Sequence, residues 1–393
     1  MAPVISAKSY RFVPPRVNAF WPAVIQRILP FYLSRAWGVE SVECRGVERL
    51  HASFTAGHGI LLAPNHCRPC DPLVLGSLGR AAGRPFFIMA SAHLFMNGGG
   101  MAWLLPRVGA FSVYREGLDR EALKKAIEIL QQARRPLVVF PEGVISRTND
   151  RLNTLMDGVA FMARNAAKAR PVVIHPVAIR YFFRGDLAAS LMPVLDSIER
   201  RLSWQPQVAL PLRERIAKVG FALLELKEIE YFGDPQPGAL ADRLARLTDQ
   251  LLVPLEREWL AGKRDGDVVA RVKLLRKAIL PDLIEGEVTD SDRARRWRQL
   301  NDLELAQQIF FFPPDYLGET PTPERLLETV ERYEEGLAGE ATIHRPLHAV
   351  IGVCDAVRVN PKRDRGTETD PVMERVREQL HTTLQRLAAE RPA

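Results

Sequence analysis

The fold is decided by the stretch GILLAPNHCRPCDPLVLGSLGR, residues 59–80. Its first part, GILLAP, is a short apolar run of the kind that forms a buried strand. Asp71 and Pro72 then predict a helix start, because Asp caps free backbone N–H groups and Pro is tolerated in the first helical turn. The segment PLVLGSLGR continues as the helix. A buried strand followed by a helix is the unit from which parallel sheets are assembled.

The same alternation of strand-like and helix-like segments continues to about residue 185. Further strands are expected at RPFFIMA, PLVVF and PVVIHPVAIRYF, residues 84–90, 136–140 and 171–182. The helical spacing of Ala122, Ala126 and Leu130 predicts an amphipathic helix between two of them. The sequence therefore predicts an α/β fold with a largely parallel or mixed sheet flanked by helices.

After residue 185 the pattern becomes mostly helical, with long charged faces interrupted by Pro and Gly. Residues 348–359 again resemble a strand, and a closing helix follows Asp370 and Pro371. Near the start, aromatic and aliphatic residues lie beside arginines over 21–37, where Pro30 is expected to interrupt any helix. We therefore expect an N-terminal membrane-docking or packing segment (1–40), an α/β core (41–185), a helical insertion (186–344) and a C-terminal strand and helix that complete the core (345–393).

Composition limits the kinds of partner. The formal charge of +7 favours anionic partners, including an anionic membrane surface. Nucleic acid is not expected, because no basic motif with interleaved aromatic residues is present. Four cysteines in 393 residues indicate a reducing compartment. With no signal-like N-terminus and no apolar run of roughly 18 to 20 residues, we expect a cytoplasmic protein that is peripheral on the membrane surface.

The Cys67-x-x-Cys70 pair leaves a second kind of chemistry open. Such pairs act in redox reactions when they begin a helix, where the dipole lowers the thiol pKa. A zinc site would need further ligands, yet Cys44 and Cys354 are isolated in the sequence. We interpret Cys67 and Cys70 as small, partly buried loop residues, and no metal site is predicted.

Four short segments occur in order: NHCRPCD, GAFSVYR, FPEGVISR and VVIHPVAI, at residues 65–71, 109–115, 140–147 and 172–179. Together they resemble the blocks of the glycerolipid acyltransferase superfamily, the His-x-x-x-x-Asp enzymes that include 1-acylglycerol-3-phosphate acyltransferases. The resemblance covers about residues 40–185 and, more loosely, 345–393. It implies acyl transfer from a thioester to an alcohol, without a cofactor.

The chemistry of that transfer explains the first block. The attacking hydroxyl must lose a proton, and an imidazole accepts protons near neutral pH, so His66 is the predicted base. A carboxylate on the other ring nitrogen fixes the tautomer, and Asp71 is the predicted partner. If the acceptor attacks directly, no acyl-enzyme is needed. The alternatives are a turn histidine and a plain helix cap.

The other blocks supply candidates for substrate binding. Arg115 and Arg147 each follow an apolar run and suit a phosphate through their planar guanidinium groups. Gly143 helps form a tight turn, and Glu142 can accept from acceptor hydroxyls or hold a neighbouring loop. Val144-Ile145 replaces the family's usual Thr-Arg, so one expected phosphate-binding Arg is missing. Arg68, where the family usually has Ser, can supply a cation from another loop.

We thus predict an O-acyltransferase of phospholipid biosynthesis. The expected donor is acyl-CoA or acyl-carrier protein, and the expected acceptor is a lysophospholipid, with 1-acylglycerol-3-phosphate favoured. The apolar region 85–106 is a candidate shelter for the acyl chain. Two alternatives stay open: another lysolipid acceptor, or a non-catalytic lipid-binding or scaffold protein.

Overall fold

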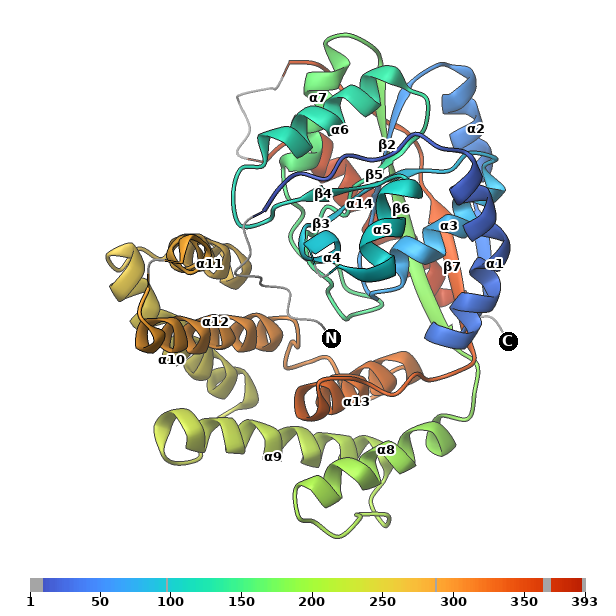
Figure 1. Cartoon of the computed structure of the whole chain (residues 1–393). Helices are drawn as coiled ribbons and strands as arrows, with labels where there is room; N and C mark the ends of the chain where they lie inside the picture. Colours follow the sequence, from blue (N-terminus) through green and yellow to red (C-terminus); the bar gives the residue numbers. More distant parts are fainter. Residues whose placement is uncertain (1–9, 97, 287, 363–368, 391–393) are drawn as a thin grey trace. The chain divides into compact units, whose positions relative to one another are not determined.

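The computed structural model describes residues 10–96, 98–286, 288–362 and 369–390 (Figure 1). The chain divides into two compact units. The α/β unit comprises residues 10–185 and 343–390, and the helical unit comprises residues 186–342. Each unit is described by itself.

Within the described residues, the α/β unit forms an eight-stranded sheet of order β1-β7-β6-β2-β5-β3-β4, with β8 beside β6. The strands are β1 (Val39–Arg45), β2 (Gly59–Pro64), β3 (Phe87–Ser91), β4 (Ala110–Val113), β5 (Leu137–Val138), β6 (Val172–Phe183), β7 (Leu347–Val353) and β8 (Val357–Arg358). Strands β2 to β6 are mutually parallel, whereas β7 pairs antiparallel with β6 and parallel with β1. The predicted α/β class with a largely parallel or mixed sheet is confirmed.

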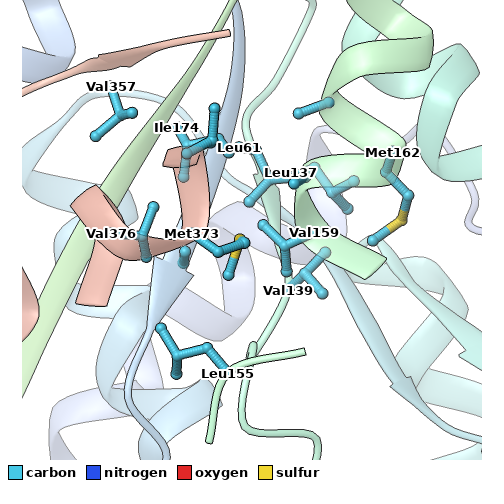
Figure 2. Packing of buried hydrophobic residues seen from close by; sticks show 14 of the residues in the cluster. Leu61, Leu137, Val139, Leu155, Val159, Met162, Ile174, Val357, Met373 and Val376 are labelled. Atoms are coloured by element: carbon cyan, nitrogen blue, oxygen red, sulfur yellow. The ribbon is translucent and has the colours of Figure 1, made fainter. Parts of the chain in front are cut away.

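Helices cover both faces of this sheet. They are α1 (Phe20–Trp37), α2 (Val47–Thr55), α3 (Asp71–Ala81), α4 (His93–Met96), α5 (Gly99–Arg107), α6 (Arg120–Gln132), α7 (Gly158–Ala167) and α14 (Pro371–Ala389). One face is packed by α6, α7 and α14, and α1 and α3 pack together on the other side, against β1. Figure 2 shows the first of these cores, where Leu61 and Ile174 of the strands meet Val159 of α7 and Val376 of α14.

The C-terminal segment adds two strands to the sheet, β7 between β1 and β6 and β8 beside β6, so the prediction of one strand over 348–359 was wrong in this respect. Strand β7 ends at Val353, and β8 begins at Val357. Pro176 of β6 faces this break, because its carbonyl accepts from the N–H of Cys354 at 2.9 Å. A proline lacks the N–H that a continuous ladder requires, so the gap between β7 and β8 accommodates Pro176 in an inner strand.

Helix α1 continues through Pro30, contrary to the predicted interruption. Pro30 is exposed, so the carbonyl left without its helical partner can be hydrated, while Leu29 and Leu33 are buried. Leu29 also lies where α1 crosses Gly76 of α3, and a Cβ on that glycine would come within 2.6 Å of the leucine side chain. Packing therefore outweighs the cost of the proline. Among the described residues, no helix combines the length and apolar character needed to cross a bilayer.

The segment before α1 covers the edge strand β4. Ser112 donates its N–H to the carbonyl of Val13, and its hydroxyl accepts from the N–H of Val13. The ring of Tyr10 stacks on Tyr114, and its hydroxyl donates to Asp119 at 2.7 Å. Covering an edge in this way removes a template for pairing with other chains.

The helical unit contains α8 (Leu187–Arg201), α9 (Leu212–Phe232), α10 (Leu240–Leu260), α11 (Val268–Glu285), α12 (Asp290–Phe310) and α13 (Pro323–Ala338). Leu252, Leu275 and Leu303 from α10, α11 and α12 belong to one buried apolar cluster.

The same side-chain link joins three successive pairs of helices in this unit. A fully buried Glu near the end of one helix pairs with an Arg in the first turns of the next. The pairs are Glu199 with Arg215, Glu228 with Arg243, and Glu256 with Arg271, each at 2.6 Å. Each arginine neutralises a carboxylate that would otherwise be costly to bury.

Candidate active site

The candidate site forms where the parallel strands end. His66 lies two residues beyond β2, and Asp71 is the first residue of α3. The prediction that Asp71 caps this helix was wrong, because the N-cap position belongs to Cys70 and no side-chain cap bond is present there. The carboxylate of Asp71 points back to the strand end instead. Carboxyl ends of parallel strands are where α/β proteins gather their ligands.

His66 and Asp71 are in direct contact, as the sequence predicted. The Nδ1 atom of His66 lies 2.8 Å from Oδ2 of Asp71. Asp71 is fully buried, whereas the His66 side chain retains 14% of its exposure. A carboxylate at Nδ1 holds the imidazole in the tautomer with its proton on that nitrogen, so Nε2 is the atom that can take a proton from a substrate.

The FPEGVIS loop, residues 140–146, holds His66 from three directions. Glu142 accepts the backbone N–H of His66 through Oε1 at 2.8 Å. The carbonyl of His66 accepts from the N–H of Ser146 at 2.7 Å. The imidazole stacks on the ring of Phe140, with 4.0 Å between ring centroids and 25° between planes. Both the backbone and the ring of His66 are therefore fixed by one loop.

Glu142 is itself buried, and its second oxygen accepts from the N–H of Asn153 at 3.1 Å. Burial raises the pKa of Glu142 to about 7, although the hydrogen bonds from His66 and Asn153 oppose that shift. Both carboxylate oxygens thus bind backbone groups of neighbouring loops. This geometry favours the role of Glu142 in holding neighbouring loops. Contact of Glu142 with acceptor hydroxyls stays a prediction.

Arg115 reaches the same loop, because its Nη2 donates to the carbonyl of Gly143. Gly143 has a left-handed φ of 68°, and a Cβ there would lie 2.3 Å from Cε of Met156. Arg147 follows Ser146 and also has a left-handed φ, of 58°. The structure thus brings His66, Glu142 and Arg115 together around one loop and places Arg147 at its end, while phosphate binding by the arginines stays a prediction.

Two polar residues near these groups were missed by the sequence analysis. Tyr181, near the end of β6, donates its hydroxyl to Oδ1 of Asp71 at 2.6 Å. His93 begins α4 and bonds Ser91 at 2.9 Å. Burial and the nearby charge of Arg115 lower the pKa of His93. Neither residue belongs to a recognisable block, and their proximity to the site depends on contacts that are distant in sequence.

Arg68 and the two cysteines surround the buried side of the pair. The guanidinium group of Arg68 lies over the ring of Tyr181, 5.5 Å from its centroid. Cys67 and Cys70 are both buried, and burial raises the pKa of Cys70 to about 12. A thiol in that state is protonated at neutral pH and is therefore a poor nucleophile and a poor metal ligand. Among the described residues, no group of His, Cys, Asp and Glu has the arrangement of a metal site.

A buried carboxylate–histidine pair and an arginine that contacts the neighbouring loop thus lie together at the ends of the parallel strands. The family model described as Acyltransferase matches residues 41–180, so this segment is an acyltransferase domain of the glycerolipid acyltransferase superfamily. None of the curated proteins compared with the chain matches it. The acyltransferase resemblance predicted from the four blocks is thereby confirmed for that segment.

Proposed function

We propose that the protein transfers a fatty acyl group from acyl-CoA or acyl-carrier protein to a hydroxyl of a phosphorylated glycerolipid, with 1-acylglycerol-3-phosphate as the acceptor. The observation that carries this proposal is the 2.8 Å contact between Nδ1 of His66 and Asp71, held in place by the FPEGVIS loop. The acyltransferase domain at residues 41–180 supports the reaction class.

In the proposed mechanism, Nε2 of His66 takes the proton of the acceptor hydroxyl as its oxygen attacks the thioester carbonyl. A carbon–oxygen bond forms, the carbon–sulfur bond breaks, and the electron pair leaves with the sulfur. The imidazolium then returns its proton to the departing thiolate. Asp71 stabilises the imidazolium while it carries the proton. The reaction consumes the thioester and the alcohol and needs no further reactant.

Phosphate recognition is assigned to the arginines around the loop. Arg115 contacts the Gly143 carbonyl, and Arg68 lies beside Tyr181, so both cations are held close to groups that bind His66 or Asp71. Arginine supplies several donors in one plane, which suits the oxygens of a phosphate monoester. Arg147, at the end of the same loop, is the third candidate.

The test is thiol release from an acyl-CoA and from an acyl-carrier protein, each with and without 1-acylglycerol-3-phosphate. We expect release that depends on the acceptor and is lost in His66→Ala. A panel of lysolipids with other headgroups distinguishes the acceptor. Acceptor-dependent transfer by a folded His66→Ala variant would refute the mechanism, and no release from either donor would favour a lipid-binding or scaffold role.

We also propose that the α/β unit docks on an anionic membrane surface. Helix α1 exposes Phe20, Ile28 and Phe31, and α5 exposes Met101 and Trp103. The two helices meet at Trp21, whose ring lies 5.0 Å from that of Trp103. An aromatic surface of this kind suits the boundary between headgroups and acyl chains.

Charge on and around this surface supports the proposal. Helices α1, α4 and α5 contain no Asp or Glu, and Arg107 lies 3.9 Å above the ring of Trp103. Residues 186–342 have 21 Lys and Arg against 29 Asp and Glu, a formal charge of −8. The remaining residues have 33 against 18, a formal charge of +15. The basic charge thus belongs to the part of the chain that contains the acyltransferase domain, where it would attract anionic headgroups.

Co-sedimentation with phosphatidylglycerol and phosphatidylcholine vesicles tests this docking. Phe31→Ser removes a side chain that is 75% exposed on α1, and Phe161→Ser is a matched change of an exposed phenylalanine on α7. We expect binding to the anionic vesicles that is weakened by Phe31→Ser and unchanged by Phe161→Ser. Equal binding by both variants would exclude α1 as the docking helix.

A further inference from the structure

Asp71 is a buried carboxylate that receives more than one hydrogen bond besides that of His66. Its Oδ2 accepts from the backbone N–H of Arg68 at 2.9 Å as well as from Nδ1 of His66. Its Oδ1 accepts from the hydroxyl of Tyr181 at 2.6 Å. The Sγ of Cys67 lies 3.9 Å from the same oxygen, a long contact for a weak donor. Tyr181 is therefore the strong side-chain donor to Oδ1.

We infer that Tyr181 is a positioning residue that fixes the rotamer of Asp71 and tempers its charge toward His66, an inference that rests on the proposed role of the His66–Asp71 pair. Each carboxylate oxygen of Asp71 has its own side-chain donor: Oδ2 contacts His66, and Oδ1 accepts from Tyr181. With Oδ1 held by Tyr181, the rotation that would turn Oδ2 away from His66 costs a hydrogen bond. A short bond from a neutral hydroxyl to an ionised oxygen is stronger than one between neutral groups.

The phenol is suited to this task because it keeps its proton. Tyr181 is fully buried on β6, and burial together with the nearby Asp71 raises its pKa well above the ordinary value. Its hydroxyl also lies 3.5 Å from the Sγ of Cys70, a long contact with a weakly polar sulfur, whereas the bond to Asp71 is 2.6 Å. The hydroxyl is thus a constant donor over the pH range in which an imidazole titrates.

The position of β6 explains how a distant residue reaches Asp71. Side-chain amides take the place of a neighbouring strand where β6 extends beyond β2. Asn65 bonds both backbone groups of Ile179, and Asn149 does the same for Tyr181. These bonds hold the strand in register at Tyr181. The residue lies immediately after the segment 41–180 that matches the acyltransferase family.

The first test is the pH dependence of kcat/KM for Tyr181→Phe. Without the hydroxyl, more negative charge faces His66, so its imidazolium is stabilised and the acidic limb of the profile moves to higher pH. We expect kcat to fall roughly tenfold to a hundredfold, as when a supporting hydrogen bond is removed. Because Tyr181 is proposed to act through Asp71 and not on substrate, KM should stay within about twofold.

Two controls separate positioning from a general effect on folding. Tyr231→Phe removes a hydrogen bond of the same kind and length, 2.6 Å to Asp302 in the helical unit, and should leave the profile unchanged. Replacing Tyr181 alone by a ring-fluorinated tyrosine keeps the hydroxyl and makes it a stronger donor. In that variant the acidic limb of the kcat/KM profile should move to lower pH. If Tyr181→Phe does not fold, this shift alone tests the role of Tyr181.

A double-mutant cycle provides the final criterion. In an Asp71→Asn background the effect of Tyr181→Phe on kcat should largely disappear, because the carboxylate through which it acts is gone. An unmoved acidic limb in the fluorinated variant, or an undiminished effect of Tyr181→Phe beside Asp71→Asn, would overturn the inference. The His66→Ala variant separates failure of the proposed mechanism from failure of this inference. Full activity of His66→Ala would refute the mechanism itself. An inactive His66→Ala together with a Tyr181→Phe variant of normal activity and pH profile would refute only the role of Tyr181.

Discussion

The carboxylate of Glu142 accepts a hydrogen bond from the backbone N–H of His66 at 2.8 Å, although the two residues are 76 positions apart in the chain. This bond joins the loop after β2 to the loop after β5. The proposed base is therefore held by its backbone as well as by Asp71, and the two attachments come from different parts of the fold.

Glu142 should make stability depend on pH. Its pKa is raised from 4.5 to about 7 in the folded protein, so between these values the folded state binds more protons than the unfolded state. The free energy of unfolding must then fall as pH rises through this window. Relative to Glu142→Gln, the wild type should lose about 2 to 3 kcal/mol between pH 5 and pH 8. Urea unfolding at several pH values measures this, and a pH-independent difference would contradict it.

Gly143→Ala should affect activity more than stability. The left-handed φ of 68° costs an alanine about 1 kcal/mol, and the exposed Met156 side chain can move away from the added methyl group. Gly57→Ala is the matched control, since Gly57 has a φ of 67° and nothing within 4 Å of the added Cβ. Both variants should lose similar stability in thermal unfolding. Only Gly143→Ala should raise KM for a phosphorylated acceptor, because it disturbs the carbonyl that Arg115 contacts; an unchanged KM would argue against that role.

Breaking an ion pair between helices of the helical unit should lower the free energy of unfolding substantially. Arg243→Met leaves the fully buried Glu228 without its cation and should cost about 3 kcal/mol or more. Lys227→Met removes the exposed pair with Glu230 and should cost less than about 0.5 kcal/mol. Chemical denaturation of the full-length variants compares them. Similar losses in the two variants would mean that burial does not set the strength of these links.

Alkylation should leave the proposed activity intact. Burial raises the pKa of Cys70 to about 12 and that of the half-buried Cys44 to about 11, so neither thiol is ionised near neutral pH. Iodoacetamide should therefore modify the folded protein slowly, and Cys70→Ala should retain transfer activity. Rapid labelling of Cys70 accompanied by loss of activity would restore the redox interpretation of the Cys67-x-x-Cys70 pair.

Local patterns in the sequence predicted much of the fold. Apolar runs located β2, β3 and β6, and the alternation with helices indicated the α/β class. The errors came where tertiary contacts override local preference. Pro30 does not end α1, because Leu29 and Leu33 are buried on either side of it, and the strand predicted over 348–359 is divided in two opposite Pro176.

In the candidate site, too, contacts between residues close in sequence could be predicted, whereas contacts between distant residues could not. His66 and Asp71 are five residues apart, so spacing alone could pair them, and the structure brings them together. The contact of Asp71 with Tyr181 spans 110 positions and depends on the length of β6 beyond β2. The only sequence signal was a tyrosine near the end of a largely apolar strand, since a buried hydroxyl requires a partner.

The place of β7 in the sheet has a consequence for synthesis on the ribosome. Residues 347–353 lie between β1 and β6, so an inner strand of the α/β unit is translated after the whole helical unit. The nascent chain through residue 185 lacks that strand and leaves the flanks of β1 and β6 unpaired. Domains generally fold as their segments emerge. The helical unit can thus reach its native state first, and the α/β unit is completed last.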